Sequence, residues 1–380
     1  MTMAKTILIL GCGTGGVVAA NVLAKVLPKE HRIALVDRRE KHVFLAGLPL
    51  VVTGKRKPSQ IVRSLKRLEG PNLQFIQAEV QEFHPDDKTV RTDQGFLSYD
   101  SLIIALGTEQ HGISGHNLAF NPYRLEEAEM LHQRLRSFRR GHIVIFVSSL
   151  PFTGTIAPYE LTLVIDDYFR KRGLRREIQI SLVTPESRLL SFASPAYSEK
   201  LKSIMEKRNI LLFTERETHA LSKTGIVGPR GSDIPGDLFI GIPHHKGPAP
   251  FRNSPIANRE GWLTVDPHTL ATCLEDVYAL GDATSILSPQ GTPIPKLGFF
   301  AHYQAEVVAR NLALAYTNQP QRFSFVGGAK GASMLTGLKR GSFVSVDAFQ
   351  RPPVMTLSHP NPLAYLTKMF FERYWLKAWF

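Results

Sequence analysis

The chain has 380 residues, 43% of them apolar and 21% charged, the balance of a soluble globular protein with room for two or three domains. Its net charge of +13 favours an anionic partner such as nucleic acid, an anionic membrane face or an acidic substrate. The sequence has no zinc-ligand spacing, RNP-type strand or basic heptad region, which argues against nucleic acid. Cys12 and Cys273 are its two cysteines, which excludes a disulfide framework and indicates a reducing cytoplasm.

Residues 5–37 predict a strand, a glycine-rich turn, a helix and a second strand. The turn has the pattern GxGxxG, and an acid follows it at the spacing expected for a contact to a ribose hydroxyl. We therefore predict a dinucleotide site in which the turn and the helix N-terminus bind the pyrophosphate. Its candidate residues are Gly11, Gly13, Thr14, Gly15, Gly16, Asp37 and Arg38. The glycines also argue against a signal peptide or a spanning helix in the uncharged residues 6–24.

Further along the chain, residues 96–108 predict another strand, which ends near Ala105 and Gly107. These two residues and Val80 are additional candidates for contacts to the dinucleotide.

Residues 142–148, a helix near 157–171 and residues 177–183 predict a second strand–helix–strand unit. Its first turn has Gly154 as its one glycine, and Pro151 removes a backbone donor. We interpret the end of the second strand, VTPES, as lacking an acid for a ribose. The sequence therefore disfavours NADH binding in this unit.

His244 and His245 follow this unit in the stretch GIPHHKGPAP. A spaced acid or cysteine ligand does not accompany them, so we predict a structural loop here and no metal site.

Residues 261–284 predict a strand that ends at Gly281-Asp282. Together with the first turn and residues 96–108, this strand resembles the flavoprotein superfamily with two dinucleotide-binding domains, which includes disulfide reductases, type II NADH dehydrogenases and sulfide:quinone oxidoreductases. The resemblance implies an α/β fold of two Rossmann-like domains and non-covalently bound FAD. It also implies that Asp282 accepts from a hydroxyl of the ribityl chain.

Residues 292–316 contain Pro295-Lys296-x-Gly298 before a long predicted helix, which resembles the sulfide:quinone oxidoreductase and flavocytochrome sulfide dehydrogenase branch. There the helix N-terminus would face the flavin pyrimidine ring and stabilise the anionic reduced form. Lys296 is expected to add to this effect, the alternative being a surface lysine. Phe299 and Phe300 are candidates for an apolar quinone slot.

In the same branch, a PFxC-type segment ending in APYE supplies a cysteine that attacks sulfide or carries polysulfide. Residues 151–160 have both ends of this segment, but Gly154 stands at the cysteine position. A second redox cysteine, expected around Ser333 or Met334, is also absent. Cys12 belongs to the glycine turn and Cys273 lies at the far end of its strand, so neither is expected to replace these cysteines, and the sequence disfavours cysteine-based sulfide oxidation. Glu160 is a candidate proton relay, the alternative being a first-turn acid that complements the helix dipole.

Residues 362–380 predict an amphipathic helix. Its charge-free arc includes Leu363, Phe370, Phe371, Tyr374, Trp375 and Ala378, while Lys368, Glu372, Arg373 and Lys377 fall on the other half; Trp379 lies near its end. This pattern predicts a helix that lies on a membrane surface, too short and too charged to cross it. A helix packed on the core or at a dimer interface would have a similar pattern.

These segments predict an FAD-binding domain made of residues 1–110 and 261–325, a second Rossmann-like domain at 111–260 and a C-terminal segment at 326–380. The resemblance implies an oxidoreductase on the inner face of the cell membrane that passes electrons from a small-molecule donor through FAD to a quinone. The alternatives are a type II NADH:quinone oxidoreductase and a non-catalytic FAD-binding partner or complex subunit. The sequence leaves a homo-oligomer open.

Overall fold

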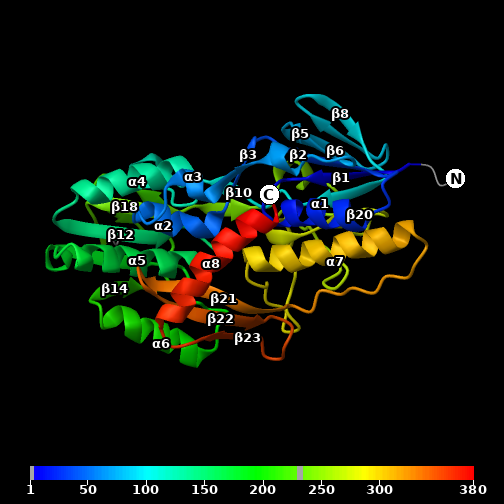
Figure 1. Ribbon diagram of the computed structural model, residues 1–380. Helices are drawn as coiled ribbons and strands as arrows, with labels where there is room; N and C mark the ends of the chain where they lie inside the picture. Colours follow the sequence, from blue (N-terminus) through cyan, green and yellow to red (C-terminus); the bar gives the residue numbers. More distant parts are fainter. Residues whose placement is uncertain (1–3, 229–233) are drawn as a thin grey trace.

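The computed structural model describes residues 4–228 and 234–380, and two five-stranded parallel sheets organise this part of the chain (Figure 1). The first sheet has the order β20-β9-β1-β2-β5 and the second has the order β11-β18-β12-β13-β14. The strands of the first sheet are β1 (Thr6–Leu10), β2 (Arg32–Asp37), β5 (Leu73–Gln77), β9 (Ser101–Ile104) and β20 (Val277–Ala279). Those of the second are β11 (Ala119–Phe120), β12 (Gly141–Val147), β13 (Ile178–Val183), β14 (Ile210–Phe213) and β18 (Leu238–Ile242).

The central strands of both sheets are continuous apolar runs because helices or loops cover both of their faces. Residues 7–10 of β1 and residues 143–147 of β12 are all buried. Strand β20 pairs in parallel with β9, Val277 opposite Leu102, although about 170 residues separate them. In chain order, the last strand of the first sheet therefore comes after all strands of the second sheet.

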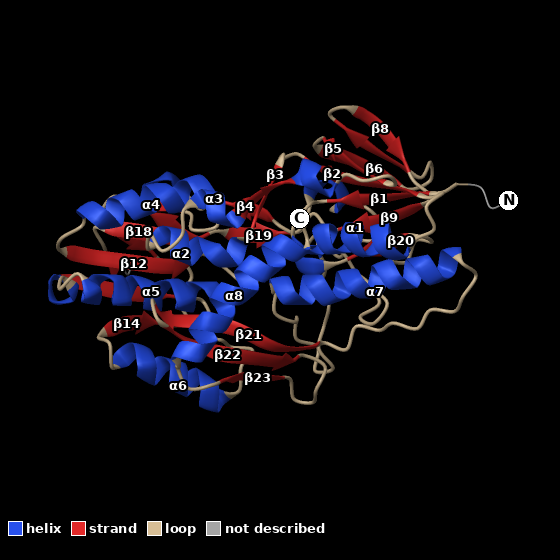
Figure 2. Ribbon diagram, in the orientation of Figure 1, coloured by secondary structure: helices blue, strands red, loops and turns tan. Residues whose placement is uncertain are grey.

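Long helices cover these sheets, and α1 and α7 lie side by side against the first sheet (Figure 2). Gly and Ala in α1, such as Gly15 and Ala19, are buried and allow the close approach of α7. The helices are α1 (Thr14–Val26), α2 (Leu48–Val52), α3 (Pro58–Ile61), α4 (Leu125–Ser137), α5 (Ala157–Lys171), α6 (Pro195–Glu206), α7 (Gly298–Tyr316) and α8 (Pro362–Ala378).

An antiparallel sheet, β21 (Gly328–Gly337), β22 (Arg340–Asp347) and β23 (Val354–Leu357), packs against α5 and α8. The carboxylate of Asp167 in α5 accepts from the Leu338 N–H at 2.7 Å and pairs with Lys171 at 3.0 Å. Burial raises the pKa of Asp167, but these two partners outweigh it and lower the pKa overall. The carboxylate thereby attaches the β21–β22 turn to the second sheet's helix.

The remaining strands are short. They are β3 (Lys41–Val43) with β4 (Val62–Ser64); β6 (Val80–His84) with β7 (Thr89–Thr92) and β8 (Gly95–Ser98); β10 (Glu109–His111) with β19 (His244–Lys246); and β15 (Ala220–Leu221) with β16 (Gly225–Val227) and β17 (Ile234–Pro235). The β10–β19 pair joins the segments that run between the two large sheets.

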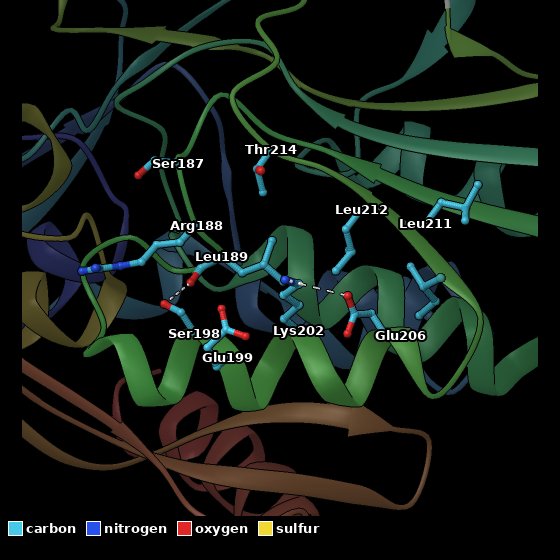
Figure 3. Close-up of a pocket in the computed structure, with 11 residues that line it drawn as sticks. Ser187, Arg188, Leu189, Ser198, Glu199, Lys202, Glu206, Leu211, Leu212 and Thr214 are labelled. Atoms are coloured by element: carbon cyan, nitrogen blue, oxygen red, sulfur yellow. Dashed lines mark hydrogen bonds and ion pairs between the residues drawn. The ribbon is translucent and has the colours of Figure 1, made fainter.

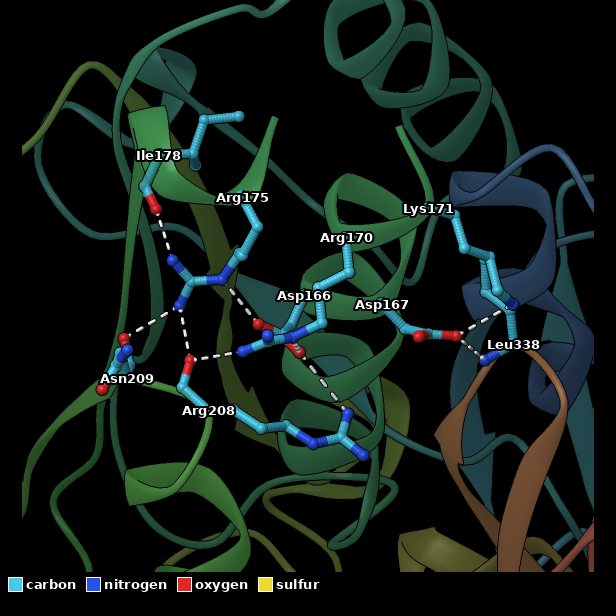
Figure 4. Close-up of polar contacts among 9 residues, drawn as sticks. All are labelled: Asp166, Asp167, Arg170, Lys171, Arg175, Ile178, Arg208, Asn209 and Leu338. Atoms are coloured by element: carbon cyan, nitrogen blue, oxygen red, sulfur yellow. Dashed lines mark hydrogen bonds and ion pairs between the residues drawn. The ribbon is translucent and has the colours of Figure 1, made fainter. Parts of the chain in front are cut away.

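A buried carboxylate fixes the C-terminal end of α5 (Figure 4). Asp166 is fully buried and accepts from Arg170 at 2.7 Å and Arg175 at 2.6 Å, with Arg208 at 3.5 Å. Arg175 also donates to the carbonyl oxygens of Ile178 and Asn209. Arg170 and Arg175, two of the basic residues at 168–176, are therefore paired within the fold.

The C-terminal helix α8 crosses the middle of the molecule from the β21–β22 hairpin towards α1 (Figure 1). Asn361 caps its start, since its side chain accepts from the Ala364 N–H at 2.8 Å. In the described residues, no helix is long and apolar enough to cross a membrane.

Candidate functional site

The glycine turn after β1 is closed so tightly that side chains are excluded from two of its three motif positions. Gly11 has φ +96°, and a Cβ there would lie 2.4 Å from the carbonyl oxygen of Ala105. A Cβ on Gly16 would lie 1.8 Å from the carbonyl oxygen of Gly11. A Cβ on Gly13 would meet no atom within 4 Å, so this glycine borders open space. Gly11 and Gly16 shape the turn, and Gly13 leaves room for a ligand.

Asp37, at the end of β2, binds the backbone of this turn. Its carboxylate accepts from the backbone N–H of Cys12 at 2.8 Å and from that of Arg39 at 2.9 Å. The sequence predicted only a contact to a ribose, and this bracing of the turn was missed. Arg38 is 67% exposed and pairs with Glu79 at 3.1 Å, beside Val80 rather than over the turn.

The Gly281-Asp282 pair and the start of α7 lie directly against the glycine turn. Leu280 contacts the position of a Gly15 Cβ, and the Gly281 N–H donates to Gln304 Oε1 at 2.7 Å. On the other side, Thr14 Oγ1 lies 3.7 Å from the position of a Gly298 Cβ. Residues that are about 270 positions apart in the chain thus lie next to one another, and their role in binding a dinucleotide stays a prediction.

Lys296 is embedded in this site. Its Nζ donates to the carbonyl oxygens of Asp282 at 2.7 Å and Thr284 at 2.9 Å, and it lies 3.9 Å over the ring of Trp262. Burial lowers the pKa of Lys296 to about 8, which the Asp282 carboxylate opposes. Burial likewise raises the pKa of Asp282, which Lys296 opposes. The alternative of a solvated surface lysine is therefore wrong.

The loop that contains Gly154 docks on the same lysine. The Gly154 N–H donates to the Lys296 carbonyl oxygen at 2.8 Å, and Thr153 Oγ1 lies 3.0 Å from Thr108 Oγ1, next to Gly107. Tyr123 donates from its hydroxyl to the Thr153 carbonyl oxygen at 2.7 Å. Gly154 has φ +66°, a conformation that a side chain at this position would strain. The segment that resembled the sulfur-handling loop therefore does lie at the candidate site.

His245 was expected to lie in a structural loop, but it lies in strand β19 (His244–Lys246). It is 1% exposed, its ring packs 5.8 Å from that of Tyr123, and within the described chain neither ring nitrogen has a hydrogen-bond partner. Burial lowers its pKa to about 4, with further lowering by His244 and Lys296. In the described residues, no group of three or more His, Cys, Asp or Glu side chains is placed to hold a metal ion.

The second sheet has an acid where the sequence interpretation found none. Glu186 lies three residues beyond β13, but it is buried and accepts from the Tyr159 hydroxyl and from the Ser191 N–H. It is therefore turned into the protein, away from a ribose position. A hollow of about 360 Å³ lies beyond it, between Arg188, α6 and β14 (Figure 3). The candidate residues named from the sequence do not line this hollow.

Helix α8 presents two different faces. Its outward side chains include Leu363, Leu366, Phe370, Phe371 and Tyr374, which are 48–71% exposed. The rings of Phe370 and Tyr374 stack with centroids 6.2 Å apart. An exposed apolar face of this size fits contact with another apolar phase or protein.

The inward face of α8 corrects three sequence predictions. Lys368 and Glu372, placed on the polar half, are buried in ion pairs with Glu160 and Arg56. Trp375, placed on the membrane side, is 2% exposed and donates to His302 Nδ1 at 3.4 Å. Helical periodicity separates two faces of the helix, but it does not reveal that buried residues of opposite charge lie opposite one of these faces.

The remaining aromatic candidates also differ in how far they are buried. Phe300 is 2% exposed and packs in the core against Phe325, whereas Phe299 beside it is partly buried. Trp379 packs on His302. Phe44, which no motif signalled, contacts Phe371 of α8, and next to it Leu45 is 50% exposed.

This geometry defines an α/β protein whose dinucleotide turn, Gly-Asp motif and helix α7 converge between two parallel sheets. A model of the pyridine nucleotide-disulphide oxidoreductase family matches residues 5–321, and the chain belongs to this family. The prediction of an oxidoreductase is thereby confirmed.

Individual relatives fall into the two groups that the sequence resembled. The chain is 26% identical over 365 residues to mitochondrial sulfide:quinone oxidoreductase of Mus musculus, covering 91% of this chain and 79% of the relative. It is 24% identical over 345 residues to type II NADH:quinone oxidoreductase of Staphylococcus aureus, covering 81% and 82%. The X-ray structure of the sulfide:quinone oxidoreductase from Aquifex aeolicus superposes with a TM-score of 0.88 at 23% identity, covering 99% of this chain and 91% of that one. The resemblance predicted from the motifs is confirmed.

Proposed function

We propose that this protein is an FAD-dependent oxidoreductase that passes electrons from a small-molecule donor to a quinone at a membrane surface. One observation carries the proposal: the glycine turn, Asp282 and Lys296 converge beside a helix with an exposed aromatic face. Quinone-reducing relatives in both groups support the acceptor.

The residues present fit FAD. Gly13 borders open space at the N-terminus of α1, where free N–H groups and the helix dipole favour a pyrophosphate. Asp37 and Asp282 would accept from the ribose and ribityl hydroxyls. Bound FAD supplies a two-electron acceptor, and the chain's own contribution is the positive end of α7 with Lys296, which favours added negative charge.

The donor site argues against NADH. The loop at Gly154 is docked on Lys296, Pro151 has no N–H to offer, and Glu186 is committed to Tyr159. A pyrophosphate would find neither a glycine turn nor an available acid in this unit.

The donor site also lacks the thiol of the sulfide route. Gly154 has no side chain, and Met334 at the second position is buried in β21. Burial raises the pKa of the Cys12 thiol well above its ordinary value, while Cys273 is exposed and precedes β20. The donor would therefore react without a protein thiolate.

We assign the quinone to the side of α8. Phe44 and Phe371 line that side together with the exposed Leu45, and the partly buried Phe299 lies in the first turn of α7. Glu160 is paired with Lys368, so a proton released or taken up there would pass between two buried groups. The exposed aromatic face of α8 would lie on the inner, anionic face of the membrane, to which the net charge of +13 is suited.

Anaerobic mixing tests the proposal. The purified protein should show flavin absorbance, and chemically reduced protein should be reoxidised by a short-chain quinone. Rapid bleaching by NADH would instead establish the pyridine-nucleotide alternative, and rapid bleaching by hydrosulfide would show that sulfide reacts without the cysteines. A reduced flavin that no quinone reoxidises would refute the proposed acceptor and favour the non-catalytic alternative.

A further inference from the structure

The direction of one peptide group in the glycine turn is fixed by a side chain outside the motif. The Cys12 N–H donates to Asp37, and the Cys12 carbonyl oxygen lies 2.8 Å from His42 Nδ1. Because a carbonyl oxygen only accepts, Nδ1 is the protonated nitrogen of this imidazole.

This bond sets the direction of the next backbone donor. A peptide group is planar and trans, so the Cys12 C=O and the Gly13 N–H point in opposite directions. While His42 holds the carbonyl on the protein side, the Gly13 N–H is directed to the other side of the turn. Gly13 is also the motif glycine that borders open space.

His42 in turn is held by the end of α8. The ring is 4% exposed, and its centroid lies 5.2 Å from those of both Trp375 and Phe380. Within the described residues, its Nε2 has no hydrogen-bond partner. The bond to Cys12 is thus the polar contact that determines how the imidazole is oriented.

The C-terminal helix and the residues after it make further contacts with the rest of the protein. Asn21 of α1 donates to the Trp379 carbonyl oxygen at 3.1 Å, and Lys25 lies 5.7 Å over the Trp379 ring. About two and three helical turns before Trp379, Glu372 pairs with Arg56 at 2.5 Å and Lys368 pairs with Glu160. These contacts fix the position of α8 along its own axis, and with it the positions of Trp375 and Phe380.

We propose that His42 is a positioning residue for the dinucleotide pyrophosphate, and that the C-terminal helix is coupled to cofactor binding through it. The inference rests on FAD as the cofactor of the proposed function. Binding linkage is reciprocal, so the cofactor must favour the docked state of α8 by the same factor by which docked α8 favours the cofactor.

Three substitutions at one position test the positioning role, with the FAD dissociation constant of the reconstituted apoprotein as the readout. His42→Ala should weaken FAD binding about tenfold, the effect of losing one well-placed hydrogen bond with its alignment. His42→Asn places an amide nitrogen near the position of Nδ1 and should restore affinity to within about threefold. His42→Gln reaches the position of Nε2 instead and should not.

The thermal midpoint of each apoprotein separates positioning from a merely structural role. If FAD affinity rises and falls with the thermal midpoint of the apoprotein across the three variants, the role of His42 is merely structural and the inference is overturned. Equal FAD affinity in the Asn and Gln variants would also overturn it. A protein that binds no FAD in any form would refute the proposed cofactor itself, which is a different outcome.

Proteolysis measures the reciprocal effect. Arg373 lies on the exposed face of α8, and tryptic cleavage there should be slowed by FAD. The protection should shrink about tenfold in His42→Ala and also in Phe380→Ala, which removes one of the two rings on the imidazole. Equal protection in the native chain and both variants would show that the helix and the cofactor are not coupled.

Discussion

Replacing Lys368 with methionine would leave Glu160 buried without its cation. The two side chains are 8% and 4% exposed, so solvent screens little of their interaction. Burial raises the pKa of Glu160 and the Lys368 charge opposes that rise. Without Lys368 the folded protein must bind a proton at Glu160. The free energy of this protonation is about 1.36 kcal/mol for each pH unit above 4.5, the ordinary pKa of the carboxyl group. The expected loss relative to the native chain is at most about 3.4 kcal/mol, because burial already raises the pKa of Glu160 in the native protein and the native chain therefore carries part of this cost.

Urea unfolding at two pH values distinguishes this charge effect from lost packing. In Lys368→Met the folded carboxyl keeps its proton while the unfolded chain releases one above pH 4.5, so the deficit relative to the native chain should shrink as the pH falls. At pH 5 it should be no more than about 0.7 kcal/mol. Lys377→Met, at an exposed position of the same helix, is the matched control and should change stability by less than about 0.5 kcal/mol. The absence of a deficit at pH 7, or a deficit that pH does not change, would refute the reasoning.

Three further predictions follow from named contacts. Gly11→Ala should lower the thermal midpoint far more than Gly95→Ala, because both glycines have positive φ but only Gly11 has a backbone atom within 3 Å of the new Cβ; equal losses would contradict this. Phe370→Glu should weaken co-sedimentation with anionic liposomes and leave FAD affinity unchanged, since Phe370 is 71% exposed; unaltered co-sedimentation would remove the membrane role of α8. His42 has a pKa of about 4 in the folded protein, so the unfolded chain binds more protons between pH 6.5 and 4, and stability should fall as the pH drops through that window. His42→Asn should flatten the slope by up to about 1.4 kcal/mol per pH unit in urea titrations, and an unchanged slope would show that the imidazole is not buried in its neutral form.

Local pattern was enough to predict the first unit of the fold. The apolar strand, the glycines and Asp37 lie within about thirty residues, and each constrains its neighbours through backbone geometry, so their arrangement follows from spacing. The start of α7 was predictable for the same reason, because Pro295 and Gly298 mark its boundary.

The interior partners of charged residues were not predictable. Lys368 and Glu160 are separated by about 200 residues, and Arg56 and Glu372 by more than 300, so no periodicity relates them. Glu186 follows β13 closely enough to serve a ribose, and only the contact with Tyr159 from another element reveals that it is turned inward. His42 and Tyr123 belong to no motif, and their roles depend on segments that meet them only in the folded chain.

The late arrival of β20 has a consequence for how the protein is made. A ribosome that has synthesised residues 1–276 has produced the glycine turn, but neither Asp282, Lys296 nor the helix that supports His42 exists yet. The edge of the first sheet beside β9 stays unpaired during that interval, exposing backbone groups to wrong partners. Binding of the proposed FAD would therefore have to wait until residues well beyond the second sheet have been synthesised.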